Sequence, residues 1–214
     1  MNLLRSKKEY YPVYWVDNFL TNDEIEKIKT YAKTLTLQDA KVGGQEENEK
    51  KEFTLDYHIK DPNIGVVPRK RITDIKWFTL NENTNWLFKK IIDEIIDVNG
   101  KNFDLQLKFV EDLQFSEYTE EKRGFYTKHR DCGSKKSLDN YVDIRKLSFT
   151  IQLTDENEYE GGELIFYIDE KEKKAPKSKG TIVFFESDIL HEVTSVTKGV
   201  RHSLVSWVQG PNLR

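Results

Sequence analysis

The chain has 214 residues, a formal net charge of −3 and a mean hydropathy of −0.71. These values suit one globular domain, exclude a disordered chain, and supply no overall attraction to nucleic acid or to an anionic membrane. Cys132 is the only cysteine, which excludes an intramolecular disulfide framework and a zinc site that needs several thiolates. The sequence shows neither a signal peptide nor an apolar run approaching the roughly 20 residues of a membrane-spanning helix. We therefore expect a soluble cytoplasmic protein that does not bind membranes.

The first third of the chain predicts one strand, one helix and then loops. Alternating aromatic and β-branched residues predict the strand over 13–19. Thr21 and Glu24 predict a capping box for the helix that follows. Between about residues 38 and 70, Gly, Pro and dense charge predict loops, and we place no chemistry there.

The rest of the chain predicts a second helix and then a series of strands. The helix is expected over 85–98 and ends at Gly100, and beyond it the hydrophobic period changes to two. The strands are expected at 103–110, 113–119, 124–131, 146–154, 162–168, 181–187, 191–196 and 201–208. We interpret the chain as a single α+β domain, in which a helical support region (1–100) braces a double-sheet barrel or jelly roll (101–214).

Two histidines on these strands are candidate metal ligands. His129 and Asp131 lie two apart at the end of one strand, so their side chains point to the same face and can converge on one ion. His191 lies where a later strand could deliver a second imidazole from the other side of the barrel. Two imidazoles and one carboxylate are the ligands of non-haem Fe(II) oxygenases, although zinc, manganese or nickel would also suit them. Taken alone, a His-x-Asp tripeptide is more often a solvated surface pair.

The last predicted strand carries a candidate anion site. Arg201 and Ser203 lie two apart and therefore face the same interior space. A buried Arg needs an anion, and its fork of N–H donors matches a carboxylate. Ser203 adds a hydroxyl donor to the same group, whereas His202 faces the opposite side of the strand.

In this order, the candidate residues resemble a known superfamily, the 2-oxoglutarate and Fe(II)-dependent oxygenases. The residues that carry the resemblance are His129-x-Asp131, Gly161-Gly162-Glu163-Leu164, His191, Arg201 and Trp207. The chain most resembles the prolyl 4-hydroxylase-like branch, whose members often open with a phrase like VDNFLTNDEIEKI, which stands here at 16–28. The resemblance implies a double-stranded β-helix core and iron held by His129, Asp131 and His191. It also implies that the distal carboxylate of 2-oxoglutarate pairs with Arg201, at a position where this branch has Lys or Arg.

The resemblance suggests roles for three aromatic residues as well. Tyr118 resembles a Tyr whose hydroxyl helps to bind the cosubstrate carboxylate, although its spacing to His129 is slightly longer than the family's. Tyr126 resembles a substrate-side Tyr of prolyl hydroxylases, and Trp207 resembles an aromatic residue that borders the substrate pocket. Each of the three is also open to interpretation as an ordinary packing residue.

The resemblance implies that Fe(II), 2-oxoglutarate and O2 serve to hydroxylate an unactivated C–H bond, with succinate as the coproduct. Ascorbate is a further cofactor candidate. The predicted substrate is a prolyl residue in a peptide or protein, and a free amino acid is an alternative. A demethylase of alkylated nucleic acid would share the ligand set, but the acidic net charge disfavours a nucleic-acid partner. Residues 38–70 and 133–145 are candidate active-site lids.

Two rival interpretations belong to other classes. A non-catalytic barrel that binds a small molecule or a protein would have no affinity for iron and no turnover of 2-oxoglutarate. A cupin-like metal enzyme that does not use 2-oxoglutarate would leave Arg201 without a carboxylate to bind. Gly161-Gly162 is interpreted as a tight turn and the basic run 171–179 as a solvated hairpin.

Overall fold

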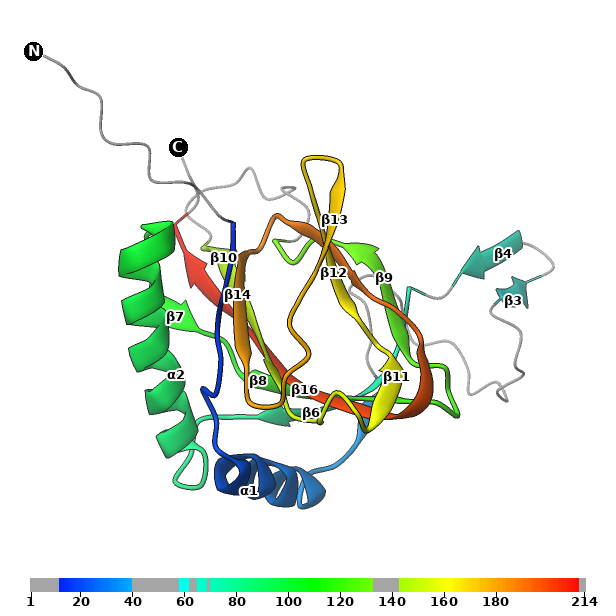
Figure 1. The fold of residues 1–214 in the computed structure, drawn as a ribbon, viewed down its shortest axis with the longest axis horizontal. Helices are drawn as coiled ribbons and strands as arrows, with labels where there is room; N and C mark the ends of the chain where they lie inside the picture. The colour runs from blue at the N-terminus through cyan, green and yellow to red at the C-terminus, as the bar shows by residue number, and fades with distance from the viewer. Residues whose placement is uncertain (1–11, 40–57, 62–64, 69, 133–142, 212–214) are drawn as a thin grey trace, which may run out of the picture.

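The structure, a computed structural model, describes residues 12–39, 58–61, 65–68, 70–132 and 143–211. Two β-sheets face each other, and two helices cover the outer face of the larger sheet (Figure 1). A separate two-stranded sheet is formed by β3 (His58–Asp61) and β4 (Gly65–Pro68). None of the described helices has the length and apolar character that a membrane crossing requires.

The larger sheet runs in the order β1-β14-β10-β16-β8-β6-β2, and β7 and β11 also pair with β16. Its strands are β1 (Val13–Val16), β2 (Gln38–Asp39), β6 (Asp74–Phe78), β7 (Phe109–Val110), β8 (Leu113–Thr119), β10 (Ile144–Gln152), β11 (Tyr159–Gly161), β14 (Ile182–Glu186) and β16 (Val196–Gly210). The smaller sheet runs in the order β13-β12-β15-β9-β5. Its strands are β5 (Arg71–Ile72), β9 (Phe125–His129), β12 (Leu164–Ile168), β13 (Lys171–Lys174) and β15 (Leu190–Val193).

The two helices begin and end largely where the sequence predicts. Helix α1 (Asn22–Lys33) has the predicted capping box, since the Glu24 N–H donates to Thr21 Oγ1 and the Thr21 N–H donates to Glu24 Oε2. Helix α2 (Asn85–Val98) does not stop at Gly100. The chain continues in a π-helical turn over Asn99–Phe103, and the left-handed residue that ends it is Asp104, with φ of 55°. The Asp104 N–H donates to the carbonyl of Asn99, which closes this wider turn and explains the difference.

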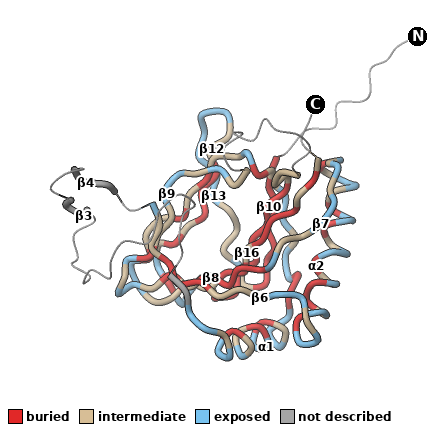
Figure 2. Tube along the Cα trace, turned by 180° about the vertical axis from the view of Figure 1, so that it is seen from behind, coloured by how far each residue is buried: buried red, intermediate tan, exposed pale blue. Residues whose placement is uncertain are grey.

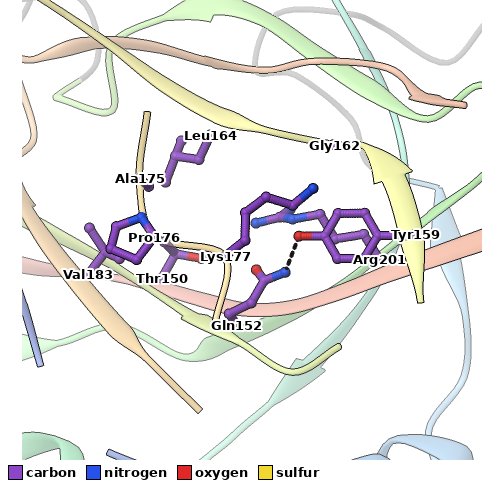
Figure 3. A pocket seen from close by; sticks show the side chains of 10 residues that line it. All are labelled: Thr150, Gln152, Tyr159, Gly162, Leu164, Ala175, Pro176, Lys177, Val183 and Arg201. Atoms are coloured by element: carbon purple, nitrogen blue, oxygen red, sulfur yellow. Dashed lines mark hydrogen bonds between the residues drawn. The ribbon is translucent and has the colours of Figure 1, made fainter. Parts of the chain in front are cut away.

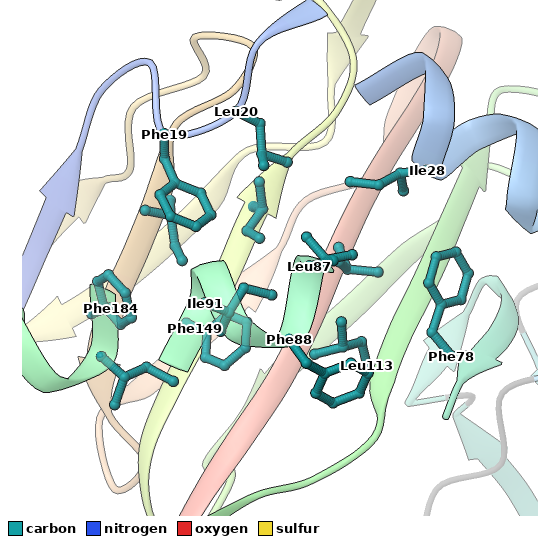
Figure 4. Close-up of a cluster of buried hydrophobic side chains, with 14 of the residues drawn as sticks. Phe19, Leu20, Ile28, Phe78, Leu87, Phe88, Ile91, Leu113, Phe149 and Phe184 are labelled. Atoms are coloured by element: carbon teal, nitrogen blue, oxygen red, sulfur yellow. The ribbon is translucent and has the colours of Figure 1, made fainter. Parts of the chain in front are cut away.

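The main hydrophobic core lies between the helices and the larger sheet (Figure 4). Helix α2 contributes Leu87, Phe88 and Ile91, and α1 contributes Ile28, all of which are buried. The strands contribute alternate residues, so Phe149 of β10 faces this core while its neighbours along the strand face the other way. The buried segments of β8, β10 and β16 run side by side through the centre of the molecule (Figure 2).

The opposite face of the larger sheet lines the interior between the two sheets. A second apolar cluster lies here and includes Phe166, Val183, Phe185 and Val193. Buried polar residues also lie on this face, and they include Gln114, Ser116, Ser148, Thr150, Gln152, Arg201 and Ser203. The predicted α+β barrel is therefore confirmed. The domain boundary near residue 100 stays a prediction, and β1, β5 and β6, which precede it, belong to the two sheets.

Candidate functional site

The structure brings His129, Asp131 and His191 together in the barrel. Strands β9 and β15 pair so that His129 and His191 are direct register partners, with ring centroids 4.2 Å apart. Nε2 of His129 lies 3.5 Å from Asp131 Oδ1, and Nε2 of His191 lies 3.6 Å from Asp131 Oδ2. One donor atom from each of the three side chains lies within 4.8 Å of the others, which is a spacing that one ion could bridge.

Both imidazoles are oriented by the backbone. Nδ1 of His129 lies 2.7 Å from the carbonyl of Thr127, and Nδ1 of His191 lies 2.8 Å from the carbonyl of Ile189. Because a carbonyl only accepts, each Nδ1 carries a proton, and each Nε2 is left facing the carboxylate of Asp131. Burial lowers the pKa of His191, which favours the neutral imidazole that binds metals.

Asp131 is held in its ionised form. The pKa of this carboxyl is lowered to about 2: burial raises it, but the hydrogen bond with His129, the electrostatic interaction with both imidazoles and the hydrogen bond from Ser148 lower it by more. The Ser148 hydroxyl lies 2.9 Å from that of Ser187, and the Asp131 N–H donates to the Ser187 carbonyl. Two buried serines therefore position the carboxylate, and neither was predicted from the sequence.

A cleft of about 450 Å3, counted with its open mouth, contains the three side chains. The cleft is also lined by other residues that the sequence predicted for the site, namely Tyr118, Tyr126, Arg201, Ser203 and Trp207. The structure thus places all the predicted site residues around one space.

Arg201 is buried on the inner face of β16, with 3% of its surface exposed. Its guanidinium lies 5.4 Å from the ring of Tyr118, its register partner on β8, and Nη1 lies 3.4 Å from Ser203 Oγ. No carboxylate of the described residues forms an ion pair with it. Gly162 makes room for the side chain, because a Cβ atom there would lie 2.9 Å from Arg201 Cδ. A buried cation without an anionic partner indicates that the anion comes from a ligand.

Arg201 also lines a second cavity, of about 260 Å3 counted with its open mouth (Figure 3). Figure 3 shows Gln152, Tyr159 and Lys177 grouped there, with the Gln152 amide donating to the Tyr159 hydroxyl at 2.6 Å. Burial raises the pKa of Tyr159, and Arg201, which also hydrogen-bonds this phenol, opposes the shift. Since the Tyr159 oxygen accepts from Gln152, its own proton is free to be donated to an anion at Arg201.

The two remaining aromatic residues line the same cleft as the metal-ligand cluster. Tyr126 stacks on the imidazole of His129, with a centroid distance of 3.5 Å, and burial raises its pKa. The Trp207 ring is covered by the guanidinium of Arg145, whose carbon lies 3.7 Å above it. Arg145 in turn forms two hydrogen bonds with the carboxylate of Glu111.

Other residues singled out in the sequence lie away from the site or outside the described residues. His202 points away from the interior, and its Nε2 lies 2.8 Å from Glu117 Oε2. Gly161 and Gly162 both have positive φ, as the predicted turn requires. Of the two candidate lids, most of 38–70 and all of 133–142 lie outside the described residues. The basic run begins as the exposed strand β13, which forms a hairpin with β12.

Sequence reasoning missed the polar side chains that approach the site from distant segments. Arg71 lies at the start of β5, directly after a segment where no chemistry was placed. Tyr159 and Gln152 are seven residues apart, and their contact depends on the path of the chain between β10 and β11. The one available signal was strand alternation, which places Ser148, Thr150 and Gln152 on one face of β10.

Residues 113–209 match the family model of the 2OG-Fe(II) oxygenase superfamily. A PKHD-type hydroxylase of Prochlorococcus marinus is 34% identical over 131 residues, which are 60% of this chain and 53% of that protein. A PKHD-type hydroxylase of Alteromonas mediterranea is 34% identical over 97 residues, 44% of this chain and 42% of that one. The chain therefore spans about half, or less, of the length of these curated relatives.

Two solved structures share the fold across nearly the whole chain. A prolyl-4-hydroxylase of Pseudomonas putida aligns with a TM-score of 0.67 and 18% identity, and the match covers 94% of each chain. A prolyl hydroxylase of Trichoplax adhaerens, solved with a peptide fragment of the hypoxia inducible factor oxygen degradation domain, aligns with a TM-score of 0.67 and 16% identity over 92% of this chain and 83% of that one. These matches confirm the predicted double-stranded β-helix core.

Proposed function

We propose that the chain belongs to the 2OG-Fe(II) oxygenase superfamily, whose family model matches residues 113–209, and that it is an Fe(II)- and 2-oxoglutarate-dependent dioxygenase that hydroxylates an unactivated C–H bond. One observation carries the proposal: a buried carboxylate and two imidazoles converge in a cleft that also contains a buried Arg201, which pairs with no described carboxylate. A metal site alone would need the triad and not the arginine. A carboxylate-binding module alone would need the arginine and not the triad.

The donor set fits Fe(II). His129 and His191 would each supply Nε2, because Nδ1 is committed to a backbone carbonyl, and Asp131 would supply an ionised oxygen. Two neutral nitrogens and one anionic oxygen, without thiolate, match the facial ligand set of non-haem iron oxygenases. When bound, the iron supplies the activation of O2 that is needed to oxidise a C–H bond.

The chain's own residues would bind and orient 2-oxoglutarate. Arg201 would hold its distal carboxylate, with Ser203 and the phenols of Tyr118 and Tyr159 as neighbouring donors. This arrangement would point the keto acid end toward the metal triad in the same cleft. Decarboxylation of the bound cosubstrate to succinate would accompany hydroxylation of the substrate.

We propose a prolyl residue of a peptide or protein as the substrate. The support is that the curated relatives are named PKHD-type hydroxylases and that the solved structures with the same fold include a prolyl hydroxylase with a peptide. Tyr126 and Trp207 would border the bound prolyl ring, since both line the cleft beside the triad. Ascorbate as a reductant and a cytoplasmic location stay predictions.

Anaerobic titration with Fe(II) and 2-oxoglutarate tests the proposal. The expected result is a metal-to-ligand charge-transfer band in the wild type and its loss in His129→Ala, because one of three ligands is removed. Ser195→Ala is the control: it removes the exposed hydrogen bond from Ser195 Oγ to the Arg123 carbonyl, and because Ser195 does not line the cleft the band should be unchanged. A wild type with no band and no 2-oxoglutarate-dependent succinate would contradict the proposal and favour a non-catalytic barrel.

A further inference from the structure

Two buried N–H groups in the cleft lack a hydrogen-bond partner. They are Nε of Arg71 and Nε1 of Trp207, and no other buried side-chain nitrogen or oxygen of the described residues is in this state. Both residues line the cleft that contains the triad. Buried N–H donors are almost always hydrogen-bonded in native proteins. Two unpaired donors in one cleft therefore indicate that a ligand supplies their acceptor.

The Arg71 side chain reaches across the cleft from the smaller sheet to the larger one. Its guanidinium carbon lies 4.7 Å from the centroid of the Tyr126 ring, which itself stacks on His129. Nη1 and Nη2 lie 3.4 Å from Gln114 Oε1 and Ser116 Oγ, respectively. These contacts are long and involve neutral acceptors, so they leave the positive charge of the guanidinium uncompensated.

The charges expected in the cleft once Fe(II) and 2-oxoglutarate are bound also indicate that an anion binds at Arg71. The charges of Fe(II), ionised Asp131, doubly ionised 2-oxoglutarate and Arg201 would cancel. Arg145, above Trp207, is neutralised by a carboxylate. Arg71 forms no ion pair with any described carboxylate, so the loaded cleft would keep one unit of positive charge beside the triad.

We propose that the substrate carries a carboxylate, which binds the fork of Arg71 and takes a further hydrogen bond from the Trp207 indole N–H. This inference rests on the proposed function and names the chemistry of its substrate. Two sources could supply the group: the α-carboxylate of a free or C-terminal residue, or an acidic side chain next to the hydroxylated residue in a peptide. Either carboxylate would accept hydrogen bonds from the unpaired N–H groups of Arg71 and Trp207 and would neutralise the charge of Arg71.

Matched ligand pairs test the inference on the protein loaded with Fe(II) and 2-oxoglutarate under anaerobic conditions, with binding measured by calorimetry. One pair is N-acetyl-L-proline and N-acetyl-L-prolinamide, and the other is an end-blocked Gly-Glu-Pro-Glu-Gly peptide and its Gln analogue. We expect the wild type to bind the carboxylate member of one pair about tenfold or more tightly than its neutral partner, a difference of about 1.4 kcal/mol. The pair that shows the preference identifies the source of the carboxylate.

Variants test whether Arg71 is the side chain that causes the preference for the carboxylate ligand. Arg71→Gln should reduce the ratio to about two or less, since it removes the charge and the fork. Lys128→Gln, which removes a cation from the exposed side of the neighbouring strand β9, should retain the wild-type ratio. If Arg71→Gln does not fold, Arg71→Lys provides the test. A ratio of carboxylate to neutral-ligand affinity that falls about threefold or more supports binding through the guanidinium fork. An unchanged ratio overturns the inference.

The outcomes separate this inference from the proposed function. A wild type without a charge-transfer band overturns both. A wild type with the band that binds both members of each pair equally, or binds neither carboxylate, overturns the inference alone. A carboxylate preference that survives in Arg71→Gln also overturns it.

Discussion

The larger sheet has two faces, which are built from alternate residues of the same strands. On β10, Leu147 and Phe149 face the helices, whereas Ser148 and Thr150 face the barrel interior. On β16, Leu204 packs under the helices while Arg201 and Ser203 line the cleft. Both faces are buried, and among the described residues the interior face carries the two cavities reported above, a buried cation without an anionic partner and two buried donors without an acceptor.

This difference separates packing from binding. Apolar side chains stabilise the fold by leaving water, and they need nothing further. Buried polar side chains cost free energy unless each has a partner, so the polar row along β8, β10 and β16 offsets this cost only through its own hydrogen bonds and those that a ligand adds. We therefore expect substitutions on the helix-facing side to change stability, and those on the interior side to change ligand binding.

The largest expected effect is on stability. Phe149→Ala should lower the free energy of unfolding by about 3–5 kcal/mol, because it leaves a cavity in the core under the helices. Thr150→Ala, the next residue and on the opposite face, should lower it by no more than about 1 kcal/mol. Urea denaturation monitored by circular dichroism measures both. Equal losses at the two positions would remove the distinction between the faces.

The next effect concerns cosubstrate affinity. Arg201→Ala should weaken 2-oxoglutarate binding by about 10- to 100-fold, since it removes charge-assisted hydrogen bonds worth about 1.5–3 kcal/mol. Iron affinity should stay as in the wild type, because Arg201 touches none of the three candidate ligands. 2-Oxopentanoate, which lacks the distal carboxylate, is the control ligand and should bind both proteins alike. Unchanged 2-oxoglutarate affinity in Arg201→Ala would exclude the role assigned to this residue.

A smaller effect is expected at the second cavity. Tyr159→Phe should weaken 2-oxoglutarate binding about fivefold, as the loss of one hydrogen bond of about 1 kcal/mol implies. The matched control is Tyr167→Phe, which removes a phenol that donates to Glu192 on the smaller sheet, away from the cleft residues. The charge-transfer titration measures both variants. If Tyr159→Phe binds 2-oxoglutarate like the wild type, the second cavity has no part in holding the cosubstrate.

Much of the site follows from spacing along the chain. His129 and Asp131, and likewise Arg201 and Ser203, share a face because side chains two apart on a strand always do. The capping box of α1 is equally local, since Thr21 and Glu24 lie within one turn. The grouping of His191 with the first pair is not local, and the family resemblance supplied it.

The remaining site residues depend on strand pairing between distant segments. Arg71 meets Tyr126 because β5 pairs with β9, and it reaches Gln114 because the two sheets face each other. The position of Tyr159 beside Gln152 likewise depends on how β11 joins β16. No pattern in the sequence specifies these partners. Side-chain alternation shows which residues of one strand share a face, but it does not show which strand pairs with it.

The same limit applies to the two faces. The sequences of β10 and β16 alternate between apolar and polar residues, which predicts one apolar face and one polar face for each strand. Which row is covered by helices, and which encloses a cavity around His129 and Arg201, is decided only when the helices pack and the sheets close. The physical reason is that the position of a residue in its own strand sets the face to which its side chain points. The distance from that side chain to one on another strand depends on strand register and on packing across the whole fold.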